Sequence, residues 1–84
     1  MASGKYSHAS GLGTIASGEA QTAIGKYNKE DANAKFIVGV GSASQPANCF
    51  ATGNNGTEDY ITIGETVLTE TQLKKIRDSE FTAT

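Results

Sequence analysis

Few residues of this chain have the types and the spacing that catalysis requires. His8 and Cys49 are the single histidine and the single cysteine, and such a pair can act as base and nucleophile. No third group that would orient the base is indicated, and His8 aligns with Thr22 at a surface-type position of a repeat. We therefore expect no enzyme activity, a solvated or interface His8, and a Cys49 that is a small buried apolar residue rather than a reactive thiol.

The acidic residues and the glycines do not form a recognisable ligand site either. Glu30-Asp31, Glu58-Asp59 and Glu65 lack the spaced oxygen ligands of a calcium loop, so we expect solvated loop charges. Gly39-Val40-Gly41 follows an expected strand, but the third glycine and the helix of a dinucleotide-binding loop are missing. The sequence therefore predicts no metal site and no cofactor.

Composition narrows the class of partner. The chain has 84 residues, a net charge of −2 and scattered lysines and arginines, which disfavours binding to nucleic acid. No apolar run approaches the roughly 20 residues of a membrane span, so no membrane insertion is expected. A chain of this length has a small core, and a single cysteine allows no internal disulfide. Oligomerisation is the remaining source of stability.

A 14-residue repeat organises the first half of the chain. Ala2-Ser3-Gly4 returns as Ala16-Ser17-Gly18, Ala9 and Gly11 return as Ala23 and Gly25, and two further glycines continue the spacing at Gly39 and Gly53. Fixed periods indicate units that stack on one another. Fourteen residues accommodate two short strands and two turns, so each unit is predicted to form one rung of a narrow parallel coil.

The third rung is apolar on both faces. Phe36, Ile37 and Val38 are consecutive, and neighbouring residues of a strand point to opposite sides. One face can fill the interior of the coil, whereas the other needs a second surface, which a copy of the same chain can supply. We therefore expect a homo-oligomer. The expected core and trimer-contact residues are Ala9, Ala23, Ile24, Phe36, Ile37 and Val38.

The remainder of the chain changes character twice. Residues 42–68 are expected to form a small β segment with a hairpin turn at Gly53–Gly56, followed by strands at residues 60–64 and 66–68. Residues 69–84 begin with a capping box, Thr69 to Gln72, and are predicted to form a short helix from Glu70 to Asp78 with a frayed end. Its apolar stripe is too narrow for a coiled coil. Residues 1–41 form the repeat region.

Two stretches of the repeat, residues 7–18 and 21–28, resemble the haemagglutinin-type head repeats of trimeric autotransporter adhesins. Residues 36–39, 48–50, 60–64 and 68–73 are similar to distal parts of phage and prophage tail-fibre proteins that carry the same head module. The resemblance implies a left-handed parallel β-roll of 14-residue repeats, interlocked as a homotrimer. With the small β segment and the short C-terminal helix expected from the residues, the predicted fold class is all-β.

The resemblance also implies a function. It indicates a structural and adhesive component of a fibre or spike, expected in the virion as part of a phage tail fibre. Such a component attaches to a host-surface glycan or receptor and contacts other virion proteins. Tyr6, Tyr27 and His8 are the candidate surface contacts. The alternatives are the head of a bacterial surface adhesin, and a glycan-binding or glycan-modifying domain with its sites at subunit seams.

Overall fold

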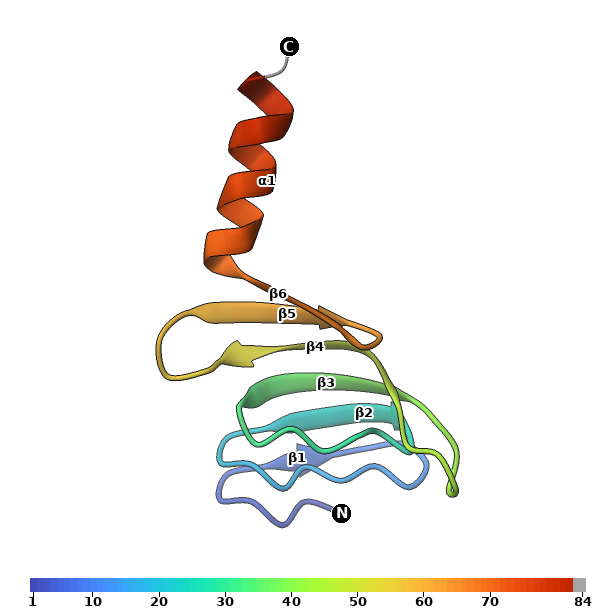
Figure 1. Cartoon of the computed structure of the whole chain (residues 1–84). Coiled ribbons are helices and arrows are strands. Elements are labelled where there is room, and N and C mark those ends of the chain that lie inside the picture. Colours follow the sequence, from blue (N-terminus) through green and yellow to red (C-terminus); the bar gives the residue numbers. More distant parts are fainter. Residues whose placement is uncertain (83–84) are drawn as a thin grey trace.

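The chain folds into one mixed β-sheet followed by one helix (Figure 1). The computed structural model describes residues 1–82, with side chains described up to residue 78. Six strands lie side by side in the order of the chain. The elements are β1 (His8–Ala9), β2 (Thr22–Lys26), β3 (Ala34–Val40), β4 (Asn48–Asn54), β5 (Asp59–Ile63), β6 (Thr66–Thr69) and α1 (Glu70–Thr82). The expectation of a mainly β chain with a C-terminal helix is confirmed.

The first three strands are parallel, and their register reproduces the 14-residue repeat. His8 pairs with Thr22, and Thr22 pairs with Phe36. In the neighbouring row, Ala9 pairs with Ala23, which pairs with Ile37. The segments that connect the strands follow the same spacing, because Ala2 and Ala16 form a parallel bridge. Equivalent positions of successive units therefore lie directly beside one another.

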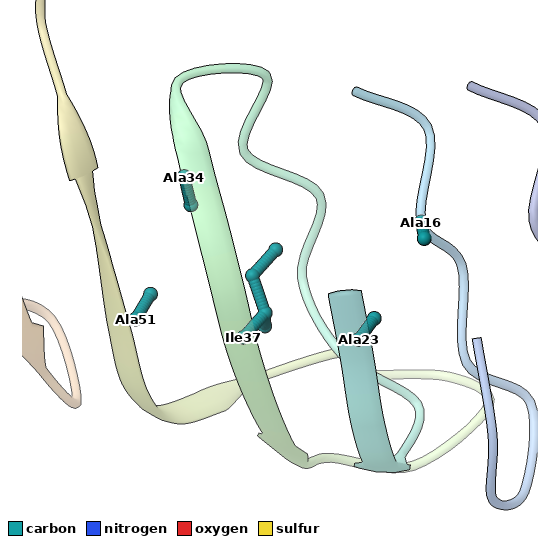
Figure 2. Close-up of a cluster of buried hydrophobic side chains, with 5 residues drawn as sticks. All are labelled: Ala16, Ala23, Ala34, Ile37 and Ala51. Atoms are coloured by element: carbon teal, nitrogen blue, oxygen red, sulfur yellow. The ribbon is translucent and has the colours of Figure 1, made fainter. Parts of the chain in front are cut away.

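The core lies between the sheet and these connecting segments. Five fully buried side chains form it, four alanines and one isoleucine: Ala16, Ala23, Ala34, Ile37 and Ala51. Figure 2 shows Ala16 on a connecting segment and the other four on β2, β3 and β4. Ala9 packs against the cluster and is partly buried. Because alanine has a short side chain, the connecting segments approach the sheet closely, and the core is one thin layer.

A buried glutamine joins three parts of the coil. The Gln21 side chain is fully buried, and its Nε2 donates to the carbonyl oxygens of Asp31 at 2.6 Å and of Ala34 at 2.7 Å. Its Oε1 accepts a hydrogen bond of 3.2 Å from the Gly18 amide. Gly18 and Asp31 lie in connecting segments and Ala34 begins β3, and an unpaired buried polar group is costly. The glutamine amide supplies hydrogen-bond partners to all three backbone groups.

Two asparagine side chains form hydrogen bonds with backbone groups of the connecting segments in the same way. Asn28 is buried, and its side-chain amide pairs with both backbone groups of Ile15, accepting at 2.7 Å and donating at 2.9 Å. Asn48 pairs with both backbone groups of Lys29, accepting at 2.7 Å and donating at 2.8 Å. Each side-chain amide thus replaces the peptide group of an absent neighbouring strand.

The second half of the sheet is antiparallel and extends the first without a break. β3 pairs with β4, β4 with β5, and β5 with β6. The hairpin turn between β4 and β5 is formed by residues 55–58 and not by Gly53–Gly56 as expected, because Gly53 and Asn54 continue β4 and pair with Tyr60 and Asp59. Gly64 and Glu65 form the turn between β5 and β6. Residues 1–41 and 42–68 therefore share one sheet.

The capping box predicted for the helix is confirmed. Thr69 Oγ1 accepts from the Gln72 amide at 3.4 Å, and Gln72 Oε1 accepts from the Thr69 amide at 3.0 Å. The helix begins at Glu70 as expected, but it continues to Thr82 rather than ending at Asp78. No glycine or proline follows Asp78 in the sequence to end it. Thr82, expected to fray, is helical, and residues 83–84 lie outside the described part.

Gly25 is a position where the coil requires glycine, and Gly56 provides a matched control. Both have a positive φ, 96° and 97°, but a Cβ on Gly25 would overlap the Gly39 carbonyl oxygen, whereas nothing lies within 4 Å of one on Gly56. We expect Gly56→Ala to lower the free energy of unfolding by about 1–2 kcal/mol. Gly25→Ala should lower the free energy of unfolding by about 1–3 kcal/mol more than Gly56→Ala does, because β2 and β3 must separate to admit the Cβ.

The measurement is urea denaturation of both variants at one protein concentration. Equal destabilisation by the two substitutions would contradict a role for close backbone approach.

Candidate functional site

The two faces of the sheet differ in how they are covered. Ala9, Ala23, Ile37 and Ala51 share one row and face the connecting segments. Residues in the alternate positions point to the opposite side. In the described chain this side is left uncovered except where α1 borders it at the β5–β6 end (Figure 1). We call this side the open face; its larger apolar residues are Ile24, Phe36, Val38, Phe50, Ile61, Ile63 and Leu68.

The open face is an apolar surface that crosses five strands, from β2 to β6. None of its larger apolar residues is fully buried, and Ile63 is 55% exposed. The Phe36 and Phe50 rings meet edge to face, with centroids 6.4 Å apart at an angle of 61°. Val40, in the next row, is 51% exposed. Contiguous apolar patches of this kind mark interaction sites.

The expectation of a third rung with two apolar faces is therefore confirmed. Ile37 is fully buried against the connecting segments, while Phe36 and Val38 lie partly exposed on the open face. Ile24 shares the row of Val38 and is also partly exposed.

Helix α1 projects beyond the sheet and buries little against it (Figure 1). All of its residues with described side chains are exposed, including Leu73 at 38% and Ile76 at 51%. An isolated helix of 13 residues is marginally stable in water. The apolar residues Leu73 and Ile76 of α1 are therefore exposed in the described chain, as are residues of the open face.

A groove of about 760 Å³ lies where α1 leaves the sheet. Its sheet side belongs to the open face, because Thr52 and Ile61 of the lining are register partners in the row of Phe36 and Leu68. The residues that give it its chemistry are Asp59, Ile61, Glu70, Leu73, Lys74 and Arg77. The groove is therefore an apolar surface with charged groups of both signs.

A second, smaller groove of about 340 Å³ lies on the covered side of the sheet, where the connecting segments end. Ala51, Thr62 and Val67 share one row across its floor. Its lining includes three carboxylates, Glu30, Asp31 and Glu65, together with Lys29. This groove gathers acidic residues from distant parts of the chain.

Asp31 lies in the polar segment that joins β2 to β3, and it attaches this segment to β5 in the antiparallel half of the sheet. Its carboxylate accepts a hydrogen bond of 2.7 Å from the Tyr60 hydroxyl, and the Tyr60 side chain is 7% exposed. Burial raises the pKa of Tyr60 well above its usual range, and the hydrogen bond and negative charge of Asp31 raise it further. Asp31 was expected to be a solvated loop charge; this role is a correction.

Two other acidic residues, Glu58 and Asp59, stabilise local structure. Glu58 accepts a hydrogen bond of 2.5 Å from the Thr71 hydroxyl near the start of α1. Hydrogen bonds from Thr71 and Thr69 lower the pKa of Glu58. Asp59 accepts a hydrogen bond of 2.9 Å from the Asn54 side chain across the hairpin turn. Glu58 therefore links the hairpin to the helix.

The predicted surface contacts lie apart from the two grooves. Tyr6 is 81% exposed, with a φ of 60° and the Lys5 ammonium 5.4 Å from its ring centroid. His8 is exposed in β1, at one edge of the sheet. Tyr27 is only partly exposed, and its ring occupies the space that a side chain at Gly13 would need. Tyr6 and His8 thus lie at the end of the sheet that is distant from α1.

Cys49 is exposed, so the prediction of a buried cysteine is wrong. The cause is an irregularity in the pairing of β3 with β4: Val38 pairs with Phe50 and Gly39 with Asn48, which leaves Cys49 as an extra residue. An extra residue of this kind is a β-bulge and does not take its place in the alternation of faces.

The sequence interpretation missed the buried amides, although the repeat contained a signal for them. Asn28 follows Thr14 by one repeat, and both are 3% exposed. Gln21 likewise follows Ser7, whose hydroxyl donates to the Gly4 carbonyl at 2.6 Å. Polar residues at repeat positions on the covered side are therefore structural. No comparable signal indicated the contact between Asp31 and Tyr60, which joins residues 29 positions apart.

The described residues contain no group of three or more His, Cys, Asp or Glu that could hold a metal ion. Across residues 1–82, no helix is long and apolar enough to cross a membrane. Comparison with protein-family models, with curated proteins and with solved structures found no match to this chain.

Because the pKa of Tyr60 is raised, we predict that the free energy of unfolding falls at alkaline pH. The unfolded state releases the tyrosine proton near pH 10, whereas the folded state retains it because its pKa is raised. The free energy of unfolding should therefore fall above about pH 10, by up to about 1.4 kcal/mol per pH unit from this group. Chemical denaturation between pH 8 and pH 12 measures the slope.

Tyr60→Phe should flatten that slope while lowering stability at neutral pH, because the hydrogen bond to Asp31 is lost. Tyr6→Phe is the control, since the Tyr6 ring is 81% exposed. An unchanged slope in Tyr60→Phe would contradict the assignment.

Proposed function

We propose that this chain is a homotrimeric structural and adhesive component of a fibre or spike, specifically a part of a phage tail fibre that contacts the host surface. The observation that carries the proposal is the open face. It crosses five strands, and Ile61 of this face lines one groove together with Leu73 of α1. A surface of this kind requires a partner, and a copy of the same chain supplies one with the same apolar character.

The small core supports an obligate assembly. The buried cluster contains only one large apolar side chain, Ile37, and four alanines. Hydrophobic stabilisation scales with the apolar area removed from water, so the core of one chain contributes little. Burial of the open face among three chains adds the larger side chains, including Phe36 and Phe50, to the apolar area of the folded state.

The choice of three chains rests on the resemblance to trimeric head repeats and on α1. Leu73 and Ile76 are three residues apart, the spacing of a and d positions in a heptad. Leucine at a with isoleucine at d favours three or four chains over two. One such pair is too short to form a coiled coil alone, but it fits helices that meet on the axis of a trimer.

The repeat suits a fibre head. Strands stacked at a spacing of 14 residues form a regular, narrow scaffold, and we propose that this scaffold is the left-handed β-roll of the resembling family. α1 and β1 lie at opposite ends of the sheet. The helix end is then directed towards the shaft of the fibre, and the end with Tyr6 and His8 is directed towards the host.

Two other functions are the alternatives. A bacterial surface adhesin head would use the same trimer and the same contacts. A glycan-binding or glycan-modifying domain is favoured only by the groove that contains Glu30, Asp31 and Glu65. Glycan hydrolysis requires two carboxylates that flank the bond. Asp31 is bound by the Tyr60 hydroxyl, which leaves Glu30 and Glu65 as the pair to test by substitution with glutamine.

The trimer is tested by a charge on the open face. Sedimentation equilibrium should give three times the mass of the chain for the wild type. Val38→Asp should lose the trimer at the same concentration, because it places a carboxylate in the interface. Val67→Asp is the matched control: Val67 lies on the opposite face and is 52% exposed. A wild-type chain that is a stable folded monomer would refute the proposal.

Attachment is tested by pull-down on bacterial cell envelopes and on their isolated glycans. We expect the wild-type trimer to bind, and Tyr6→Ala to reduce binding about tenfold without dissociating the trimer, because the Tyr6 ring is exposed and distant from α1. Thr57→Ala, in the exposed hairpin turn, is the control for a surface substitution elsewhere. A trimer that binds no envelope would support a purely structural role instead.

A further inference from the structure

The groove between α1 and the sheet has a charge pattern that suits a second copy of the same helix. The residues Glu70, Leu73, Lys74 and Arg77 all line it, and their spacing of three and four places them on one face of α1. Leu73 and Ile61 supply apolar surface. Acidic groups, Asp59 and Glu70, lie where the helix begins, and the basic groups follow one and two turns later.

Three of the four charged groups of the groove, Asp59, Glu70 and Lys74, have no ion-pair partner among the described side chains. In the part of the chain with described side chains, the ion pair of this region is between Arg77 and Asp78, at 2.9 Å, and both side chains are more than half exposed. Although Glu70 and Lys74 have the spacing of a helical ion pair, no salt bridge joins them. Asp59, Glu70 and Lys74 therefore remain available to another chain, and Arg77 can exchange its exposed partner Asp78 for a carboxylate of a neighbour.

We propose that in the trimer this groove receives α1 of a neighbouring copy, with Lys74 and Arg77 of one chain paired to Glu70 and Asp59 of the next. The inference rests on the proposed trimer. In a parallel trimer around an axis along α1, equivalent residues lie at equal height. Lys74 is then about 6 Å above Glu70 of the neighbour along the axis, a distance that a lysine side chain spans.

The pairing explains why the groove carries both signs of charge. A different protein could bind this groove with charges that are simply opposite to those of the groove. A second copy of the chain has the same charges, so each copy must carry both the acidic and the basic member of every ion pair. The apolar surface of Leu73 and Ile61 then meets the leucine and isoleucine of the neighbouring helix. The groove and the open face become one continuous interface, because Ile61 belongs to both.

The experiment is a charge exchange between two variants of the full chain. The first carries Lys74→Glu and Arg77→Glu, and the second carries Asp59→Lys and Glu70→Lys. We expect each alone to raise the concentration at which half of the trimer dissociates by about tenfold or more in low salt, and by less in about 0.5 M salt. An equimolar mixture, refolded together, should form trimers that contain both chains and dissociate at a lower concentration than trimers of either variant alone. The recovery is partial, because a trimer of two kinds of chain always keeps one interface between like chains.

The control is Lys5→Glu with Lys75→Glu, which makes the same change of charge at residues outside the groove. This variant should assemble as the wild type does. If the wild type is trimeric but the groove variants assemble normally, or if mixing fails to restore them, the pairing is wrong and the trimer stands. If the wild type is a monomer, both proposals fail.

A second measurement covers the case in which the exchanged variants do not fold. Chains with Glu70→Cys and chains with Lys74→Cys, each also carrying Cys49→Ser, are mixed, refolded and oxidised. The pairing predicts a disulfide between the two kinds of chain, detected by mass spectrometry of the linked peptides. If the two cysteines remain unlinked in a folded trimer, the helices do not meet at this groove.

Discussion

The close approach of successive 14-residue turns is the constraint on which the structure depends. The apolar side chains buried between the connecting segments and the sheet are no larger than alanine, apart from Ile37. Glycines stand where neighbouring backbones nearly touch, as Gly25 does against Gly39. This closeness makes the coil regular, but it also limits the apolar area that one chain can bury. The larger apolar side chains consequently lie on the open face.

The close approach of successive turns also determines how buried backbone groups find hydrogen-bond partners. Connecting segments in a thin coil have buried peptide groups without strand partners, and the amides of Gln21, Asn28 and Asn48 supply those partners. A side-chain amide has a donor and an acceptor at fixed geometry, so it can mimic a peptide group. Polar residues on the covered side thus stabilise the fold, while the larger apolar residues of the open face remain partly exposed.

The parts of this structure that follow from local rules could be predicted from sequence. The register of β1 to β3 follows from the repeat, and the start of α1 follows from the Thr69–Gln72 capping box. The open face follows from alternation in Phe36–Val38. Other features depend on pairing between distant residues. The exposure of Cys49 results from one extra residue opposite β3, and the role of Asp31 depends on Tyr60 in a distant strand. No local pattern encodes either contact.

The order of the strands in the sheet has a consequence for how such a protein can change in length. Each strand pairs only with its neighbours in sequence, so a 14-residue unit could be added or removed within the parallel half without altering the hairpin or the helix. Each unit would lengthen the sheet by about 4.8 Å, the distance between adjacent strands. The number of 14-residue units therefore sets the distance between the two ends of the sheet.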